Sequence, residues 1–231
     1  MFTYAPFTNP GFETANLVGW HGAPRARVSA IGSTIDDPID PLTLTNDLTP
    51  PYWANPYDGN FQARLVAGAT PHEGVESFLN LSAGWLSTAT NNRFGLADAS
   101  AIAQTVSLNG RDSMLVHWNF LAVDTAGVDD LAFLSLSGPG GSSMSILSSV
   151  ALAGSGHGAG WRTSRLTVGG SGQYRVGLGV ANFEDNMVSS IFYADAISAV
   201  PEPSSYGIAA ACICLGAVVW RGRRTPVALN K

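Results

Sequence analysis

The sequence predicts an all-β domain, folded as an antiparallel β-sandwich, followed by a single C-terminal transmembrane helix. Short alternating or apolar runs recur between turn signals, and before the C-terminal tail no window shows a sustained helical stripe. Charged residues make up only 13% of the chain, whereas glycines and prolines number 26 and 13. Many short strands joined by turns rich in Gly and Pro are typical of sandwiches and barrels.

The predicted strands follow one another without intervening helices. They span residues 61–67, 102–108, 113–120, 131–137, 145–152, 162–168, 173–181 and 190–200. In 102–108 the apolar residues occupy every second position, as in a strand with one buried face. Asn109-Gly110 follows as a tight-turn signal, so the strand from Ser113 either pairs back or crosses to a second sheet. Residues 78–86 fit either a short helix or a loop.

Three segments are predicted as loops. Residues 35–56 form a Pro-rich loop, since so many prolines cannot sustain a ladder of backbone hydrogen bonds. Residues 138–143 and 154–160 are rich in Gly and Ser, which indicates flexible connections. The glycines of 154–160 superficially suggest a phosphate cradle, but no P-loop lysine follows and no helix begins there, which favours a loop.

The C-terminal tail has the composition of a membrane helix. Residues 206–220 carry no charge, and as a helix they would reach about 22 Å, short of a ~30 Å hydrocarbon core. A buried core helix is the alternative. The absence of a polar stripe and the basic stop formed by Arg221, Arg223 and Arg224 favour the membrane. The positive-inside rule then places everything before residue 206 outside the cytoplasm.

The tail also contains a short motif, Pro201, Glu202 and Pro203, directly before the apolar stretch. The order of motif, apolar helix and arginine cluster resembles the PEP-CTERM sorting signal of exported bacterial proteins. The resemblance implies an exosortase that recognises the motif and removes the tail. It also implies a Gram-negative host that makes exopolysaccharide, and a product that is first membrane-anchored and then at the cell surface or secreted.

These features divide the chain into predicted units. A β-sandwich domain spans 1–199, the PEP motif and linker 200–205, the transmembrane helix 206–220 and a basic cytoplasmic tail 221–231. Residues 1–20 show neither a basic n-region nor an apolar h-region, so they contain no visible signal peptide. Both cysteines, Cys212 and Cys214, lie in the tail, which leaves the domain without disulfides or a cysteine nucleophile.

The two ends of the domain carry a second resemblance. Asn9-Pro10-Gly11-Phe12-Glu13, with Gly19-Trp20, is similar to the opening of the galactose-binding-like jelly roll found in many carbohydrate-binding modules. Residues 191–198 resemble its closing strand. The strand–loop–strand stretch 117–133, with Asp124, Asp129 and Asp130, is similar to bacterial surface proteins that bear the same kind of tail. Together the similarity covers most of 9–198.

The jelly-roll resemblance implies a structural calcium ion held by Glu13 and Asp195. Carboxylate oxygens suit Ca²⁺, and an ion there would tie the terminal strands together. The pattern departs from the family at Ala194, where a second acidic residue is common. The alternative is that Glu13 is a surface carboxylate near a turn and Asp195 faces solvent. The acidic cluster of Asp124, Asp129 and Asp130 is either solvated or binds a cation.

Composition narrows the class of function. A net charge of −5 with no basic stripe argues against nucleic-acid binding. The four histidines have no metal-ligand spacing, and no Gly-x-Ser-x-Gly motif anchors a catalytic serine. We therefore expect no enzyme, although two carboxylates that meet in the fold for glycoside hydrolysis remain an alternative.

Two hypotheses follow for the domain. The first is an exported, non-enzymatic surface or extracellular-matrix protein associated with exopolysaccharide and biofilm. The second is a carbohydrate-binding module that recognises exopolysaccharide through loop aromatics, with Tyr52, Trp53 and Tyr57 as the candidate platform. The alternative role for these rings is to cap the end of the sandwich. Trp118, within a predicted strand, is expected in the core.

Overall fold

The computed structural model describes residues 6–23, 26–30, 55–68, 70–89, 95–124, 129–183 and 188–201. The chain divides into two units with the boundary between Val200 and Pro201. The predicted helix 206–220, most of the PEP motif, the arginine cluster and most of the Pro-rich loop lie outside the described residues. Among the residues that are described, no helix is long and apolar enough to cross a membrane.

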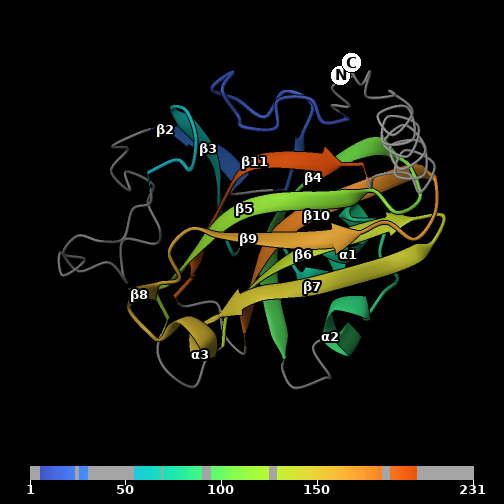
Figure 1. The fold of residues 1–231 in the computed structure, drawn as a ribbon. Helices are drawn as coiled ribbons and strands as arrows, with labels where there is room; N and C mark the ends of the chain where they lie inside the picture. Colours follow the sequence, from blue (N-terminus) through green and yellow to red (C-terminus); the bar gives the residue numbers. More distant parts are fainter. Residues whose placement is uncertain are drawn as a thin grey trace, which may run out of the picture. The chain divides into compact units, whose positions relative to one another are not determined.

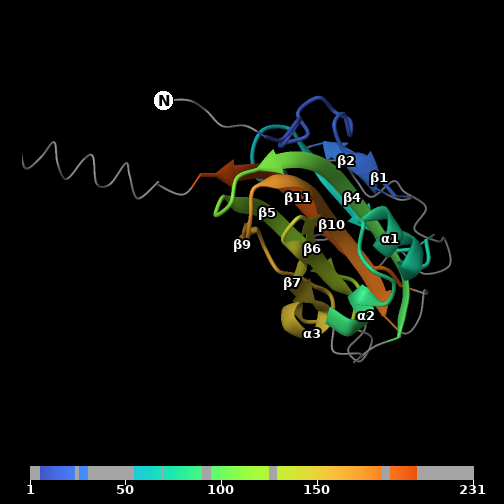
Figure 2. The ribbon, with the colours of Figure 1, turned by 90° about the vertical axis from the view of Figure 1, so that its right-hand side faces the viewer.

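The first unit is a sandwich of two antiparallel sheets, as the sequence predicts (Figures 1 and 2). Sheet A has the order β1 (His21–Gly22), β4 (Leu96–Leu108), β10 (Gly172–Phe183), β6 (Leu131–Gly138), β7 (Gly141–Ser149). Sheet B has the order β2 (Ala26–Ala30), β3 (Phe61–Val66), β11 (Ile191–Val200), β5 (Ser113–Ala122), β8 (His157–Gly158). A further strand of sheet B, β9 (Arg162–Thr167), lies outside this order and also pairs with β5.

The main core fills the space between the sheets. On β5 every second side chain, from Met114 to Phe120, points inward and is buried. Trp118 lies in this core, as expected from the sequence, and its indole Nε1 donates a hydrogen bond to Ser164 Oγ at 2.8 Å. Because successive side chains of a strand point to opposite faces, the residues between these face away from sheet A.

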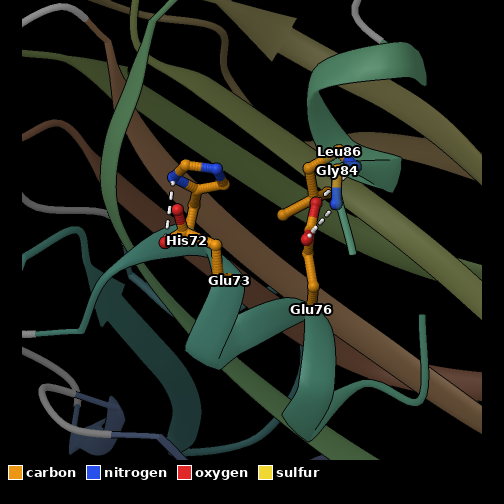
Figure 3. Close-up of polar contacts among 5 residues, drawn as sticks. All are labelled: His72, Glu73, Glu76, Gly84 and Leu86. Atoms are coloured by element: carbon orange, nitrogen blue, oxygen red, sulfur yellow. Dashed lines mark hydrogen bonds and ion pairs between the residues drawn. The ribbon is translucent and has the colours of Figure 1, made fainter. Parts of the chain in front are cut away.

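Two short helices cover the outer face of sheet A (Figure 2). They are α1 (His72–Phe78) and α2 (Trp85–Ala89), and they bury a second apolar cluster against that face. The fully buried Glu76 joins them, since its carboxylate accepts the backbone N–H groups of Gly84 and Leu86, each at 2.7 Å (Figure 3). The sequence leaves open whether residues 78–86 form a short helix or a loop. In the structure this segment connects α1 to α2. The two helices therefore close part of the outer face of sheet A.

Two predictions about local structure are corrected, and one alternative that the sequence leaves open is resolved. The predicted strand 145–152 stops at Ser149, and α3 (Val150–Ala153) begins because Asp129 Oδ1 and the Asp130 carbonyl accept the N–H groups of Ala151 and Val150. The predicted flexible loop 138–143 is the tip of the β6–β7 hairpin. After the turn at Asn109-Gly110 the chain crosses from β4 in sheet A to β5 in sheet B.

Candidate functional site

The outer face of sheet B carries side chains in rows that follow from the strand register. The first row is apolar: Val66, Ile191 and Leu121. The second is polar: Arg64, Tyr193 and Asn119. The third is Asp195, His117 and Thr163. Side chains that are distant in sequence thus lie side by side across β3, β11, β5 and β9, on the face not covered by α1 and α2.

The N-terminal segment reaches this sheet at β11. Asn9 and Phe12 both have positive φ angles, 49° and 58°, which turn the chain tightly. The Phe12 ring is buried against Trp20, whose Nε1 donates to the Asn9 carbonyl. The N–H of Ile197 on β11 donates to the Pro10 carbonyl at 3.0 Å. These contacts fix Glu13, the next residue but one after Gly11, close to the last strand.

The Glu13 carboxylate holds the backbone that leads into β3. It accepts hydrogen bonds from the N–H groups of Asn60 and Phe61, at 3.0–3.1 Å. Gly59 approaches this carboxylate so closely that a Cβ at that position would collide with it, and its φ of 66° also favours glycine. Glu13 is therefore more than a surface carboxylate near a turn, because it anchors a segment more than forty residues away in sequence.

Asp195 anchors the same segment from β11. Its side chain is fully buried, so the alternative in which it faces solvent is wrong. Its carboxylate accepts the N–H groups of Asp58 at 3.0 Å and of Ala196 at 2.7 Å. Burial raises the pKa of Asp195 to about 6, the hydrogen bonds from backbone N–H groups oppose this rise, and the charge of Glu13 adds to it.

The two carboxylates flank one point in space. A Cβ on Gly11 would lie 3.5 Å from Asp195 Oδ1 and 3.8 Å from Glu13 Cγ. Their oxygens are the hard donors that Ca²⁺ prefers. From the described residues, each of the two carboxylates accepts fewer hydrogen bonds than its lone pairs together allow. Among the described residues no three His, Cys, Asp or Glu side chains lie together in a metal-binding group. Calcium here would need backbone carbonyls or water as its other ligands.

The segment held by these carboxylates, residues 55–60, crosses the third row, and we call it the strap. Tyr57 of the strap stacks on His117 with ring centroids 3.8 Å apart and planes 13° apart. Trp161 meets Tyr57 edge-on at 5.7 Å, and its Nε1 donates to the Asn55 carbonyl at 2.9 Å. Tyr57 nonetheless keeps 49% of its surface exposed. The strap therefore presents one aromatic ring outward.

His117 is fixed beneath Tyr57 by a second contact. Thr163 Oγ1 on β9 lies 2.9 Å from His117 Nδ1, within hydrogen-bonding distance. Burial lowers the pKa of His117, so the ring is neutral at pH 7 and stacks without the cost of burying a charge. The Tyr57 platform is thus built from the strap, β5 and β9 together.

The predicted site residues fall into separate groups. Glu13 and Asp195 both hold the strap that carries Tyr57, whereas Tyr52 and Trp53 are outside the described residues. Two members of the acidic cluster bind backbone: Asp129 Oδ1 accepts the N–H of Ala151, and Asp130 Oδ2 that of Ser190 at 2.9 Å.

Sequence reasoning missed the outward-facing residues of β5 as part of this site. The signal was present, because 114, 116, 118 and 120 face the core and the strand alternation turns His117 and Asn119 to the other face.

No protein-family model and no curated protein matches the sequence. Among solved structures, TmCBM61 in complex with β-1,4-galactotriose shares 12% identity at a TM-score of 0.47, covering 87% of this chain and 100% of that chain. A family 16 carbohydrate-binding module shares 15% identity at a TM-score of 0.40, covering 85% of this chain and 99% of that chain. The CBM22-1 xylan-binding domain of Paenibacillus barcinonensis Xyn10C shares 11% identity at a TM-score of 0.36, covering 82% of this chain and 89% of that chain. Because these identities and TM-scores are low, the likeness carries no conclusion about a ligand.

Proposed function

We propose that the domain is a non-enzymatic polysaccharide-binding module whose platform is Tyr57. The observation that carries this proposal is a half-exposed aromatic ring, held on His117 and bordered by Trp161. One face of the Tyr57 ring is already stacked, so its accessible surface lies on the opposite face and the edge. Pyranose rings bind such surfaces through their C–H groups, with hydroxyls left to hydrogen-bond to polar neighbours.

The alternative role for Tyr57, a cap that closes the end of the sandwich, fits these contacts less well. A capping ring gains its stabilisation by being buried, and Tyr57 buries only about half of its surface. The strap is already fixed by Glu13, Asp195 and the Asn55–Trp161 hydrogen bond. The outward ring is therefore available for a ligand without being needed to hold the strap.

The test is binding of the purified domain to immobilised bacterial exopolysaccharide and to neutral plant polysaccharides. We expect Tyr57→Ala to lower affinity at least tenfold, about 1.4 kcal/mol, and Tyr57→Phe to retain most of it. Leu152→Ala is the control, because Leu152 is 75% exposed on α3, outside the strap and its partners. Equal binding by the wild type and Tyr57→Ala would exclude Tyr57 as the platform.

We further propose that the domain works outside the cytoplasm of a Gram-negative bacterium, sorted by its tail. The support is the sequence of the tail: the PEP motif at 201–203, the uncharged stretch 206–220 and the arginines that follow. An exosortase would process the chain after the domain has crossed the membrane. Pro201→Ala with Glu202→Ala should leave the unprocessed chain in the membrane fraction of a host that contains an exosortase. Unchanged processing would contradict the sorting role of the motif.

If the domain binds no polysaccharide, the tail alone supports an exported surface or extracellular-matrix protein. This second function needs no ligand at Tyr57, and it predicts correct sorting of a Tyr57→Ala variant with no loss of matrix association. Comparing that variant with the wild type in isolated extracellular matrix separates the two functions.

We also propose calcium as a structural ion held by Glu13 and Asp195. The support is the pair of carboxylates on either side of Gly11 and the charge repulsion between them, which a cation would relieve. Calorimetric titration of the chelator-treated domain should show binding that Glu13→Gln and Asp195→Asn each weaken. A thermal unfolding curve that calcium does not shift would reject this ion.

A further inference from the structure

We propose that Asn119 determines the specificity of this site by accepting a hydrogen bond from a sugar hydroxyl of the bound polysaccharide. The inference rests on the proposed polysaccharide-binding function and adds to it the group that the protein recognises. It starts from the place of Asn119 in the second row of sheet B, directly opposite Tyr193 of β11. His117, which carries the Tyr57 platform, is two residues away on the same face of β5.

Asn119 is a buried amide that the fold itself does not use. Its side chain is 6% exposed, and in the described part of the chain its Oδ1 has no hydrogen-bond partner. A buried acceptor without a partner destabilises a fold, so native proteins satisfy nearly all of them. A ligand bound at Tyr57 that donates a hydrogen bond to Asn119 Oδ1 would explain why this acceptor has no partner within the described residues.

Gln104 shows how this fold treats an amide that has a structural role. It is 4% exposed on β4, and its amide makes three hydrogen bonds with backbone groups. Its Oε1 accepts the N–H of Thr8, and its Nε2 donates to the carbonyls of Thr8 and Gly19, at 2.8–3.0 Å. Gln104 thereby ties the N-terminal segment to sheet A. Among the described residues the Asn119 amide makes no comparable contact, which separates it from an amide that holds the fold together.

The surroundings of Asn119 favour a hydroxyl-bearing, partly apolar ligand. Trp161, whose edge faces Tyr57, also packs against the apolar first row that contains Leu121. On the neighbouring β8 strand Gly158 is exposed, and a Cβ there would lie 2.8 Å from Leu121 Cδ2 and 3.9 Å from Asn119 Oδ1. Because this position is a glycine, no side chain at 158 stands beside Leu121 and the amide. A sugar presents C–H groups to aromatic rings and O–H groups to polar atoms, which matches this combination.

A hydroxyl is also a group that fits this amide. Asn119 Oδ1 accepts hydrogen bonds, and the Nδ2 beside it donates them. A hydroxyl group both donates and accepts, so it can pair with Oδ1 as a donor.

The test compares Asn119→Leu with Asn182→Leu in thermal unfolding and in polysaccharide binding. Leu has nearly the shape of Asn and no polar atom, so we expect Asn119→Leu to unfold at the same or a higher temperature and to bind at least tenfold more weakly. Asn182 is the matched control, since it is also buried with an unpaired Oδ1, but its Nδ2 donates to Ser189 Oγ at 3.0 Å. Asn182→Leu should unfold at a lower temperature and keep its affinity.

The outcomes separate this inference from the proposed function. Binding that is lost in Tyr57→Ala but retained in Asn119→Leu refutes the role of Asn119 alone. A wild type that binds no polysaccharide refutes both. A lower unfolding temperature of Asn119→Leu with intact binding makes Asn119 structural and also refutes the inference.

A second measurement avoids any variant that fails to fold. In the ¹⁵N-labelled wild type, the side-chain amide signals of Asn119 must shift when an oligosaccharide that binds is added, and a monodeoxy analogue lacking the recognised hydroxyl must bind at least tenfold more weakly. Signals of Asn119 that stay in place in a saturated complex would overturn the proposal.

Discussion

Replacing Glu76 with Ala should cost the domain a large part of its stability. Glu76 is fully buried and accepts the N–H groups of Gly84 and Leu86 at 2.7 Å each (Figure 3). The N–H of Leu86 belongs to the first turn of α2, where helices have no internal acceptor. A hydrogen bond to a charged group contributes about 1.5–3 kcal/mol, so two contribute about 3–6 kcal/mol. Relief of the buried charge in the variant offsets part of this, which leaves a loss of about 2–4 kcal/mol.

Urea unfolding followed by tryptophan fluorescence measures this loss, because Trp85 lies at the start of α2 and other tryptophans report on the core. Glu76→Gln keeps one acceptor oxygen and should lose about half as much as Glu76→Ala. Glu73→Gln is the control on the same helix. The Glu73 side chain is 62% exposed and its contact with His72 is 3.5 Å long, so its loss should stay within about 0.5 kcal/mol.

A Glu76→Ala variant that unfolds within about 1 kcal/mol of the wild type would refute the reasoning. So would a Gln variant that loses as much as the Ala variant, because the oxygen it keeps would then contribute nothing.

Three further predictions concern the strap and the core. Gly59→Ala should destabilise the domain by about 1–3 kcal/mol in thermal unfolding, through its positive φ and its collision with Glu13. Because the folded pKa of Asp195, about 6, lies above the usual 3.8, the folded state binds the proton more tightly. In calcium-free buffer, stability should therefore fall as pH rises from about 4 to about 6, by at most about 3 kcal/mol, and Asp195→Asn should flatten this slope in urea unfolding. Trp118→Phe should lose about 1–3 kcal/mol, because it removes the bond to Ser164 and leaves a cavity, and calorimetry measures this loss.

The strands could be predicted from sequence because their pattern is local. On β5 the buried residues 114, 116, 118 and 120 alternate with less buried ones, and on β4 the alternation at 102–108 gave the same indication. The end of β7 could not be predicted, because an apolar run of four residues fits a strand or a helix equally well. What begins α3 there is Asp129, more than twenty residues earlier in the chain.

The candidate site could be predicted only in part, for a similar reason. Glu13 and Asp195 were located through a resemblance, and Tyr57 through its place among aromatic residues in a loop. Their contacts join distant segments, as the hydrogen bond between Asn55 and Trp161 does across 106 positions. No local pattern encodes the register that sets Asp195 beside His117. Asn119 is detectable only when the burial of its side chain and its missing partner are both known.

The position of β11 in the middle of sheet B has a mechanical consequence. Any load applied to the chain beyond Val200 enters the domain along β11, which is hydrogen-bonded to β3 on one side and to β5 on the other. The ladder with β5 runs from Ile191 to Val200, whereas β3 pairs only with Ile191–Ala194, so such a load reaches the β5 ladder before the β3 ladder. The bond between Ile197 and Pro10 passes part of that force to the N-terminal segment. When the domain is tethered at this end, flow pulls on β11, which has a hydrogen-bonded neighbour on each side.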